Sequence, residues 1–149
     1  FKAVVDVIER FIKIINPKKI YLGEKDMQQL KIIDDYVKKN LKYVKVVACR
    51  TIREDNGLAL SSRNFLLSKK EKIIGAKIYK FFKSKKSLIL NKRIDLNYAK
   101  NYLLKIGVSK IDYIKIIDIN KIIKPYKKIK KKKIFIAYYL RKTRLIDNI

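Results

Sequence analysis

The sequence predicts an α/β protein: the end of a parallel sheet, followed by a small α+β unit. Two observations support this prediction. Helix-like and strand-like stretches alternate with short connections up to Arg50, a pattern that implies a parallel sheet with right-handed crossovers. After Arg50 a polar, glycine-containing segment leads into two helices and two or three strands. We therefore expect two domains, residues 1–50 and residues 51–149.

The first domain is predicted to contain two helices and two strands. A helical stripe ends at Asn16-Pro17 and consists of Val4, Ile8, Phe11, Ile12 and Ile15. Residues 20–22 are an apolar run closed by Gly23, which predicts a buried strand, and residues 44–48 predict a second strand. Between the two strands, helical spacing runs from Asp26 to about Asn40 and links Met27, Leu30, Ile33 and Val37.

Two strands do not make a stable sheet alone, so this domain is expected to be the tail of a larger α/β domain. The chain also opens with Phe1 rather than Met, inside an amphipathic pattern. Both observations lead us to expect that residues upstream of Phe1 have been lost.

The second domain is predicted to begin with two helices. Ser68 and Glu71 have the spacing of a capping box at the start of the first helix. A lysine-rich connection is expected to separate it from the second helix. Residues 95–106 predict that second helix, with Asp95 as its cap and Gly107 as its stop.

Strands are predicted to complete the second domain. Residues 111–119 and residues 134–140 each have the pattern of a strand, and residues 144–147 are a candidate for a third. The lysine run at residues 127–133 predicts a solvated hairpin loop between the first two.

Composition limits the classes of protein that this chain can belong to. A hydrophobic content of 48% argues for a packed core and against general disorder. No apolar run approaches the roughly 20 residues of a membrane helix, so we expect no membrane partner. A single cysteine, Cys49, excludes an internal disulfide, and with no visible signal peptide this fits a reducing, cytoplasmic location.

The formal net charge of +26 invites a nucleic-acid-binding interpretation. However, the basic residues are 32 Lys and only seven Arg, whereas base readout and bidentate phosphate binding favour Arg. A joint excess of Lys, Ile and Asn indicates compositional drift, so we expect no nucleic-acid partner. The alternative is a basic nucleic-acid-binding module, in which the lysine run would act with Tyr98, Tyr102, Tyr113 and Tyr126 as stacking groups. Tyrosines at such spacings are more often packing residues.

The first motif, residues 21–29, places polar groups where a strand ends and a helix begins. Ligands of open α/β sheets bind at the carboxyl ends of strands, where Gly23 stands. The helix that starts at Asp26 offers free N–H groups to an anion, and Lys25 can add a positive charge on a phosphate or a developing oxyanion. Asp26 can accept from a ribose hydroxyl or cap the helix, and Gln29 can hydrogen-bond a small polar substrate. The alternative is a capped helix with surface charges.

The second motif, residues 57–64, combines a glycine bend with phosphate-binding side chains. Gly57 allows a tight turn or a close backbone approach. Ser61, Ser62 and Arg63 then present two hydroxyls and a guanidinium, which together suit a triphosphate. Asn64 can brace the loop. The alternative is a serine cap on a short helix with an exposed arginine.

Together the two motifs resemble the pantothenate synthetases, also called pantoate–β-alanine ligases. The family pattern of a strand, G-E-K-D, x-Q-Q and R-E-x-x-G-L-A-x-S-S-R-N is matched by Gly23-Glu24-Lys25-Asp26, Gln28-Gln29, Arg53-Glu54 and residues 57–64. The ending Thr143-Arg144-Leu145-Ile146-Asp147-Asn148 also resembles the family's terminal strand. The resemblance runs in order along nearly the full length of the chain.

The resemblance implies a Rossmann-like nucleotidyltransferase domain followed by a carboxy-terminal lid from about residue 51. It implies an ATP-dependent ligase that joins pantoate to AMP, releases pyrophosphate and passes the pantoyl group from the adenylate to β-alanine, with Mg²⁺ assisting. It also implies that the complete protein is a homodimer.

The resemblance implies a role for each matched residue. Gly23 and Asp26 would hold the adenosine ribose, Lys25 would contact phosphate in the transition state, and Gln29 would hold pantoate. Ile52 and Leu60 would flank the nucleotide. The phosphates would be bound by Ser61, Ser62 and Arg63. The expected catalytic residues are therefore Lys25, Ser61, Ser62 and Arg63, and no metal ligand is assigned.

The chain departs from the family pattern in one important respect. It contains no His, so the family's amino-terminal H-x-G-H motif, which binds ATP phosphates, is absent. We therefore expect a carboxy-terminal portion that is inactive alone. Smaller departures are Arg50, where a proline is usual, and Asn56, where an aspartate is common. A further alternative is a decayed relic that folds but catalyses nothing.

Overall fold

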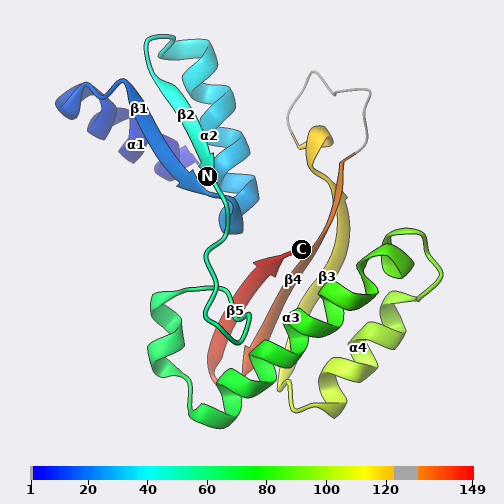
Figure 1. Ribbon diagram of the computed structural model, residues 1–149. Helices are drawn as coiled ribbons and strands as arrows, with labels where there is room; N and C mark the ends of the chain where they lie inside the picture. The colour runs from blue at the N-terminus through cyan, green and yellow to red at the C-terminus, as the bar shows by residue number, and fades with distance from the viewer. Residues whose placement is uncertain (1, 123–130) are drawn as a thin grey trace. The chain divides into compact units, whose positions relative to one another are not determined.

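The computed structural model describes residues 2–122 and 131–149, which fall into two compact units (Figure 1). The first unit runs to Thr51 and also takes in a short segment from Asn120. The second unit consists of Ile52–Ile119 and the last two strands of the chain. Each unit has its own hydrophobic core.

The first unit packs two helices against a parallel pair of strands (Figure 1). Its elements are α1 (Lys2–Ile15), β1 (Lys19–Gly23), α2 (Met27–Asn40) and β2 (Lys45–Cys49). β1 and β2 pair in parallel, as predicted. The four apolar residues from which the second helix was predicted are the four that α2 buries. Periodicity therefore identified the face of α2 that packs against the core.

β1 is less buried than the sequence predicts. Ile20 and Leu22 pack against the core of the first unit, whereas Tyr21 between them is 65% exposed. Exposure alternates along the whole strand, which is the behaviour of a strand with one covered face. The prediction of a buried strand was wrong because the apolar run includes Tyr21, which lies on the uncovered face.

The second unit packs two helices on a three-stranded antiparallel sheet (Figure 1). Its elements are α3 (Lys69–Leu90), α4 (Leu96–Lys105), β3 (Lys110–Asp118), β4 (Lys132–Leu140) and β5 (Thr143–Asn148). β4 is the central strand, and its Ile134 and Ile136 share a core with Phe82 of α3 and Leu103 of α4. The predicted helices and all three predicted strands are confirmed.

The helix ends of the second unit confirm two predictions and correct two others. Ser68 Oγ accepts from the backbone N–H of Glu71, whose carboxylate accepts from the N–H of Ser68, so the capping box is present. Gly107 follows α4 with φ of 107°, as the predicted stop. Asp95 occupies the N-cap position, but its side chain makes no capping hydrogen bond. The predicted lysine-rich connection is helical, because Lys is a good helix former and Ile89 continues the buried face.

The lysine run can be compared with the structure only in part. Lys132 and Lys133 belong to β4 rather than to a loop. Residues 127–130, and with them most of the predicted hairpin loop, lie outside the described residues.

Candidate functional site

The first motif lies at the carboxyl end of the parallel strand pair. Gly23 ends β1 and pairs with Cys49, which ends β2, so the two strand ends lie side by side. A short 3-10 helix, η1 (Glu24–Asp26), then leads into α2. A Cβ added at Gly23 would meet no atom within 4 Å, so the space beside this backbone is open. This strand-to-helix turn is the place where open α/β sheets bind ligands.

Three polar side chains gather at this turn. Lys25 Nζ lies 3.7 Å from Asp26 Oδ2, and the Lys25 side chain is 22% exposed. Asp26 is the N-cap residue of α2, yet its side chain makes no capping hydrogen bond, so the interpretation of this motif as a simple capped helix is wrong for Asp26. Gln29 is half-buried in the first turn of α2. The predicted site residues of the first motif are therefore close neighbours.

The second motif belongs to a small hairpin, residues 52–60. The Leu60 N–H donates to Ile52 O at 2.9 Å, and the Glu54 N–H donates to Leu58 O at 2.8 Å. At the turn, Gly57 has φ of 98°, which favours glycine. Leu58 is buried and belongs to the core of the second unit. The hairpin is therefore closed by backbone hydrogen bonds and anchored by one apolar side chain.

Asn64 braces the hairpin, as predicted. Its side chain is buried, and Nδ2 donates to Ala59 O at 3.1 Å and to Glu54 Oε1 at 2.8 Å. Just before it, Ser61 Oγ accepts from the Arg63 N–H at 3.3 Å and caps a 3-10 helix, η2 (Ser62–Leu66). The alternative interpretation of a serine cap on a short helix is thus correct locally, while Ser62 and Arg63 stay exposed.

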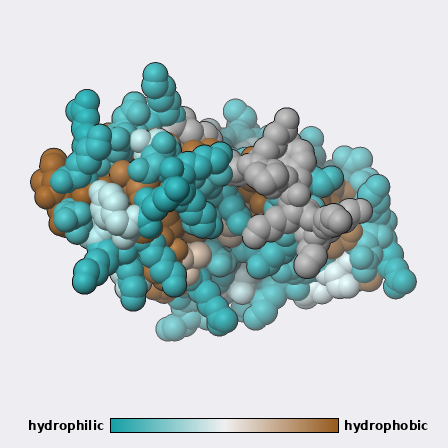
Figure 2. Space-filling view, turned by 90° about the horizontal axis from the view of Figure 1, so that it is seen from above, coloured by the Kyte–Doolittle hydropathy of each residue, from teal (hydrophilic) through white to brown (hydrophobic). Residues whose placement is uncertain are grey.

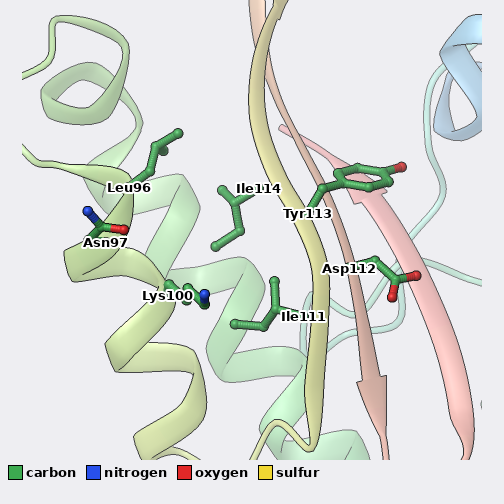
Figure 3. Close-up of a pocket in the computed structure, with 7 residues that line it drawn as sticks. All are labelled: Leu96, Asn97, Lys100, Ile111, Asp112, Tyr113 and Ile114. Carbon is green, nitrogen blue, oxygen red and sulfur yellow. The ribbon is translucent and has the colours of Figure 1, made fainter.

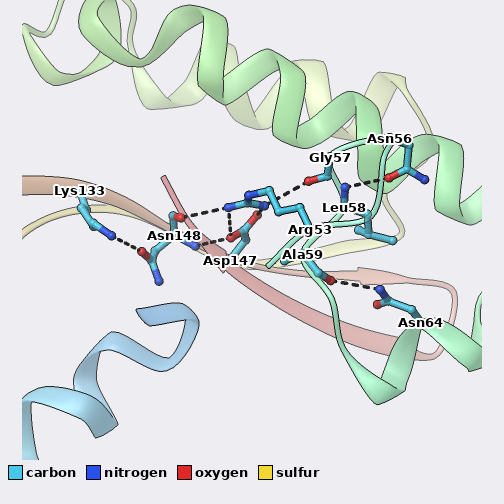
Figure 4. Close-up of polar contacts among 9 residues, drawn as sticks. All are labelled: Arg53, Asn56, Gly57, Leu58, Ala59, Asn64, Lys133, Asp147 and Asn148. Carbon is cyan, nitrogen blue, oxygen red and sulfur yellow. Dashed lines mark hydrogen bonds and ion pairs between the residues drawn. The ribbon is translucent and has the colours of Figure 1, made fainter. Parts of the chain in front are cut away.

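A largely buried ion pair, drawn in Figure 4, joins the hairpin to the last strand. Arg53 Nη1 donates to Asp147 Oδ2 at 2.6 Å, and Arg53 Nη2 donates to Asp147 Oδ1 at 2.9 Å. Tyr138 lies near the pair, and burial raises the pKa of its phenol; Asp147 raises that pKa further, while Arg53 lowers it. Sequence reasoning quoted both Arg53 and Asp147 as motif letters but assigned neither a role. The available signal was the carboxylate of Asp147, which directly follows the apolar pair Leu145-Ile146 in the terminal strand.

Two arginines of the loop also reach the outer edge of the sheet. β5 pairs with β4 on one side only. Along its other side, Arg53 Nη2 donates to Asn148 O at 3.5 Å and Arg63 Nη1 donates to Arg144 O at 3.3 Å. The Arg144 guanidinium in turn contacts Asp112, and this hydrogen bond raises the pKa of Arg144.

The remaining predicted residues are on the surface of the hairpin. Ile52 is 71% exposed and Leu60 is 54% exposed, and they face each other across the hairpin's open end. The second unit thus brings Ile52 and Leu60 together with the Ser61–Arg63 segment. The first unit brings together Gly23, Lys25, Asp26 and Gln29.

Comparison with known proteins decides the family. The family model for pantoate-beta-alanine ligase matches residues 1–149. The chain belongs to the pantoate–β-alanine ligase family. A pantothenate synthetase of Campylobacter hominis is 37% identical over 155 residues, covering 100% of this chain and 55% of that protein. One from Endomicrobium trichonymphae is 41% identical over 153 residues, covering 100% of this chain and 53% of that protein.

Solved structures of the family agree with the fold. Pantothenate synthetase from Thermus thermophilus superimposes with a TM-score of 0.79 at 27% identity, covering 100% of this chain and 55% of that one. Pantoate-beta-alanine ligase from Francisella tularensis, solved in complex with beta-gamma ATP and beta-alanine, gives a TM-score of 0.74 at 33% identity, covering 98% and 48%. The chain therefore spans about half the length of the relatives that it matches.

A surface groove in this family member lies apart from both motifs (Figure 3). It has a volume of about 180 Å³ between α4 and β3. Leu96 and Lys100 of α4 face Ile111 and Ile114 of β3, whereas Asp112 lies on the other side of the strand (Figure 3), where it pairs with Arg144. The groove contains none of the predicted site residues, and we assign it no role.

The basic surface gives limited support to nucleic-acid binding. Hydrophilic residues cover most of the face shown in Figure 2. Of the proposed stacking groups, Tyr102 is stacked on Phe81 inside the second unit, with ring centroids 4.2 Å apart, and Tyr98 is 57% exposed. Tyr126 lies outside the described residues. Tyr102 is therefore a packing residue, as the more common interpretation of such tyrosines predicts.

Within residues 2–122 and 131–149, no helix has the length and apolar character needed to cross a bilayer. The same residues contain no group of three or more His, Cys, Asp or Glu side chains able to hold a metal ion.

Proposed function

We propose that this chain supplies the carboxy-terminal part of a ligase that condenses pantoate with β-alanine at the expense of ATP. The observation that carries the proposal is the family match over residues 1–149, together with the position of the first motif at the end of β1. The Francisella tularensis relative, solved with an ATP analogue and beta-alanine, supports ATP as the nucleotide.

The proposed reaction has two steps. A carboxylate oxygen of pantoate attacks the α-phosphorus of ATP, and pyrophosphate leaves, giving pantoyl adenylate. The amine of β-alanine then attacks the acyl carbon of the adenylate, the C–O bond to AMP breaks, and the nitrogen loses a proton. The products are pantothenate and AMP.

In the first step, the first motif would act on the nucleotide and on pantoate. Lys25 would offset the negative charge that develops around the α-phosphate, and the N-terminus of α2 would add its positive dipole end. Asp26 would accept from the ribose hydroxyls beside the open backbone of Gly23. Gln29 would hydrogen-bond pantoate from the first turn of α2.

The second motif would act on the phosphates that leave. The hydroxyls of Ser61 and Ser62 and the guanidinium of Arg63 would bind them as pyrophosphate departs. The exposed side chains of Ile52 and Leu60 would flank the nucleotide. The second unit, which carries this anchored hairpin and the exposed Ser62 and Arg63, would act as the lid that closes on ATP and excludes water.

Mg²⁺ commonly binds through one or two carboxylates and the phosphates of the nucleotide. Because the described residues offer no cluster of metal-ligating side chains, we assign the ion no protein ligand in this chain and no step in the reaction. The complete protein would be a cytoplasmic homodimer.

The test uses a joined enzyme, in which the unmatched part of the Campylobacter hominis relative precedes Phe1 of this chain. Pantoate-dependent exchange of labelled pyrophosphate into ATP, measured without β-alanine, reports adenylate formation directly. We expect exchange from the joined enzyme and none from the 149-residue chain alone. Lys25→Ala should lower the exchange rate by about two orders of magnitude, as loss of a charge-stabilising group can.

Lys19→Ala is the matched control, because Lys19 is exposed at the opposite end of β1. It should keep the exchange rate of the unsubstituted joined enzyme. A Lys25→Ala rate equal to the Lys19→Ala rate would remove Lys25 from the mechanism. A folded joined enzyme without exchange would favour the decayed relic over the ligase.

A further inference from the structure

We propose that Arg53 and Asp147 form a positioning pair, which holds the hairpin so that Ser61, Ser62 and Arg63 are presented to the nucleotide in a fixed place. This inference rests on the proposed function, because it assigns the pair a part in that same reaction. Neither residue contacts the nucleotide in the proposal; both act through the hairpin.

The ion pair has the geometry of a rigid joint. Both terminal nitrogens of Arg53 donate to the two oxygens of Asp147, at 2.6 and 2.9 Å. The side chains are only 16% and 7% exposed. A two-point contact between planar groups fixes orientation as well as distance, and burial removes the screening that weakens surface pairs.

Further contacts fix the Arg53 guanidinium from other directions (Figure 4). Nη1 also donates to the carbonyl oxygen of Gly57 at 3.2 Å, across the turn of the hairpin. The guanidinium carbon lies 3.9 Å from the centre of the Tyr79 ring on α3. Arg53 therefore joins the hairpin turn, α3 and β5 at one point, and a lysine ammonium could not reproduce this planar arrangement.

The hairpin transmits this anchoring to the proposed phosphate-binding residues. Arg53 bridges to Ala59 across the hairpin, and Ala59 O accepts from buried Asn64 on the far side of Ser61–Arg63. The segment is thus held at both ends, while Ser62 and Arg63 between them are exposed. Loss of the Arg53–Asp147 pair should let the whole segment shift, and displacements near 1 Å at a reacting group can cost about a hundredfold in rate.

The first arm of the test measures order in the 149-residue chain by amide hydrogen exchange. Asp147→Asn keeps the size of the side chain but removes its charge and one acceptor oxygen. The amides of Glu54, Gly57 and Leu60 are hydrogen-bonded within the hairpin and should exchange about tenfold faster or more in the variant. Amides in the middle of α3 should keep their rates.

The second arm measures kinetics in the joined enzyme, well below its melting temperature. Asp147→Asn should lower kcat for pyrophosphate release about tenfold or more while leaving KM for pantoate unchanged, because the proposed pantoate contact belongs to the first motif. A purely structural role would lower Tm and leave kcat as it was. Arg53→Lys is the second variant and should give the same pattern; it decides the outcome if Asp147→Asn does not fold.

The matched control is Asp112→Asn, which breaks the more exposed Arg144–Asp112 pair on the same sheet and should change neither readout. The proposal would be overturned if Asp147→Asn and Arg53→Lys both left the amide hydrogen exchange rates of the hairpin unchanged, or if both left kcat unchanged. If the unsubstituted joined enzyme is inactive, the proposed function fails. Amide hydrogen exchange in the 149-residue chain still decides whether the Arg53–Asp147 pair orders the hairpin.

Discussion

The backbone of Gly57 lies directly against the ring of Tyr79: a Cβ added at Gly57 would be 2.4 Å from Tyr79 Cδ1. The same ring stacks under Arg53, so Tyr79 cannot move aside without disturbing the buried ion pair. The φ of 98° at Gly57 is also one that other residues adopt only with strain.

Gly57→Ala is therefore expected to lower the free energy of unfolding of the chain by about 2 kcal/mol or more, combining backbone strain with the steric clash. Urea unfolding followed by circular dichroism measures it. Gly23→Ala is the control, because its added Cβ meets nothing within 4 Å and its φ of −70° suits any residue. If Gly57→Ala lowered the free energy of unfolding no more than Gly23→Ala does, the predicted strain and steric clash at Gly57 would be wrong.

Gly75 of α3 should respond to alanine in a direction opposite to that of an ordinary helix glycine. In an exposed helix Gly→Ala gains about 1 kcal/mol, but here the new Cβ would lie 2.7 Å from Cδ1 of buried Leu58. We expect Gly75→Ala to destabilise the chain in urea unfolding. In a Leu58→Ala background, which itself should cost about 2–5 kcal/mol, Gly75→Ala should become stabilising. Equal effects in the two backgrounds would show that the residues do not interact.

The capping box of α3 predicts a pH dependence at the acid end. Hydrogen bonds from the Ser68 side chain and backbone hold the pKa of Glu71 below its ordinary value. A lowered folded-state pKa contributes stability above the unfolded-state pKa, and this contribution is lost as pH falls through the folded-state pKa. Ser68→Ala should cost about 1 kcal/mol near neutral pH and less at acid pH, as measured by thermal melts across the acid range.

Ser84→Ala serves as the control within the same helix. Ser84 Oγ donates to Phe81 O in the preceding turn, a contact that does not favour the helix. Its replacement should be neutral or slightly stabilising at every pH. If the stability lost in Ser68→Ala did not change with pH, the hydrogen bonds of the cap would not be what lowers the pKa of Glu71.

Tyr138 predicts a second pH dependence at the alkaline end. Burial raises the pKa of its phenol, so the folded chain keeps the neutral form where the unfolded chain ionises. Stability from this group is complete below about pH 10, the ordinary tyrosine pKa, and is lost as pH rises above it. Tyr138→Phe should therefore lose less Tm between about pH 8 and pH 10.5 than the unsubstituted chain does. If Tm fell equally with pH in Tyr138→Phe and in the unsubstituted chain, Tyr138 would not be the source of this pH dependence.

Sequence patterns predicted the elements best where one local rule governs them. Helical spacing placed Ile33 and Val37 on the buried face of α2, and the Ser68–Glu71 spacing identified a cap that closes within three residues. The end of α3 was missed because the lysines after Phe82 resemble a loop in composition while favouring the helix in propensity.

The residues of the candidate site were predicted from the sequence motifs, but the contacts that hold the hairpin in place were not. Lys25 and Gln29 lie near each other in space because they are near each other in the sequence. Their grouping could therefore be predicted from the sequence. Arg53 and Asp147 are 94 positions apart, and no periodicity relates them. Their pairing depends on the order of strands in the sheet and on the path of the hairpin beside β5, which only the folded chain reveals.

The open side of β5 gives the hairpin a second consequence. Exposed strand edges are templates for pairing with other molecules, and proteins commonly block them with charged side chains or with a covering loop. Arg53 and Arg63 donate to carbonyl oxygens along that edge, so we expect the segment proposed to bind the nucleotide phosphates also to limit pairing of this edge with other chains. Substitutions that release the hairpin should reduce solubility as well as activity.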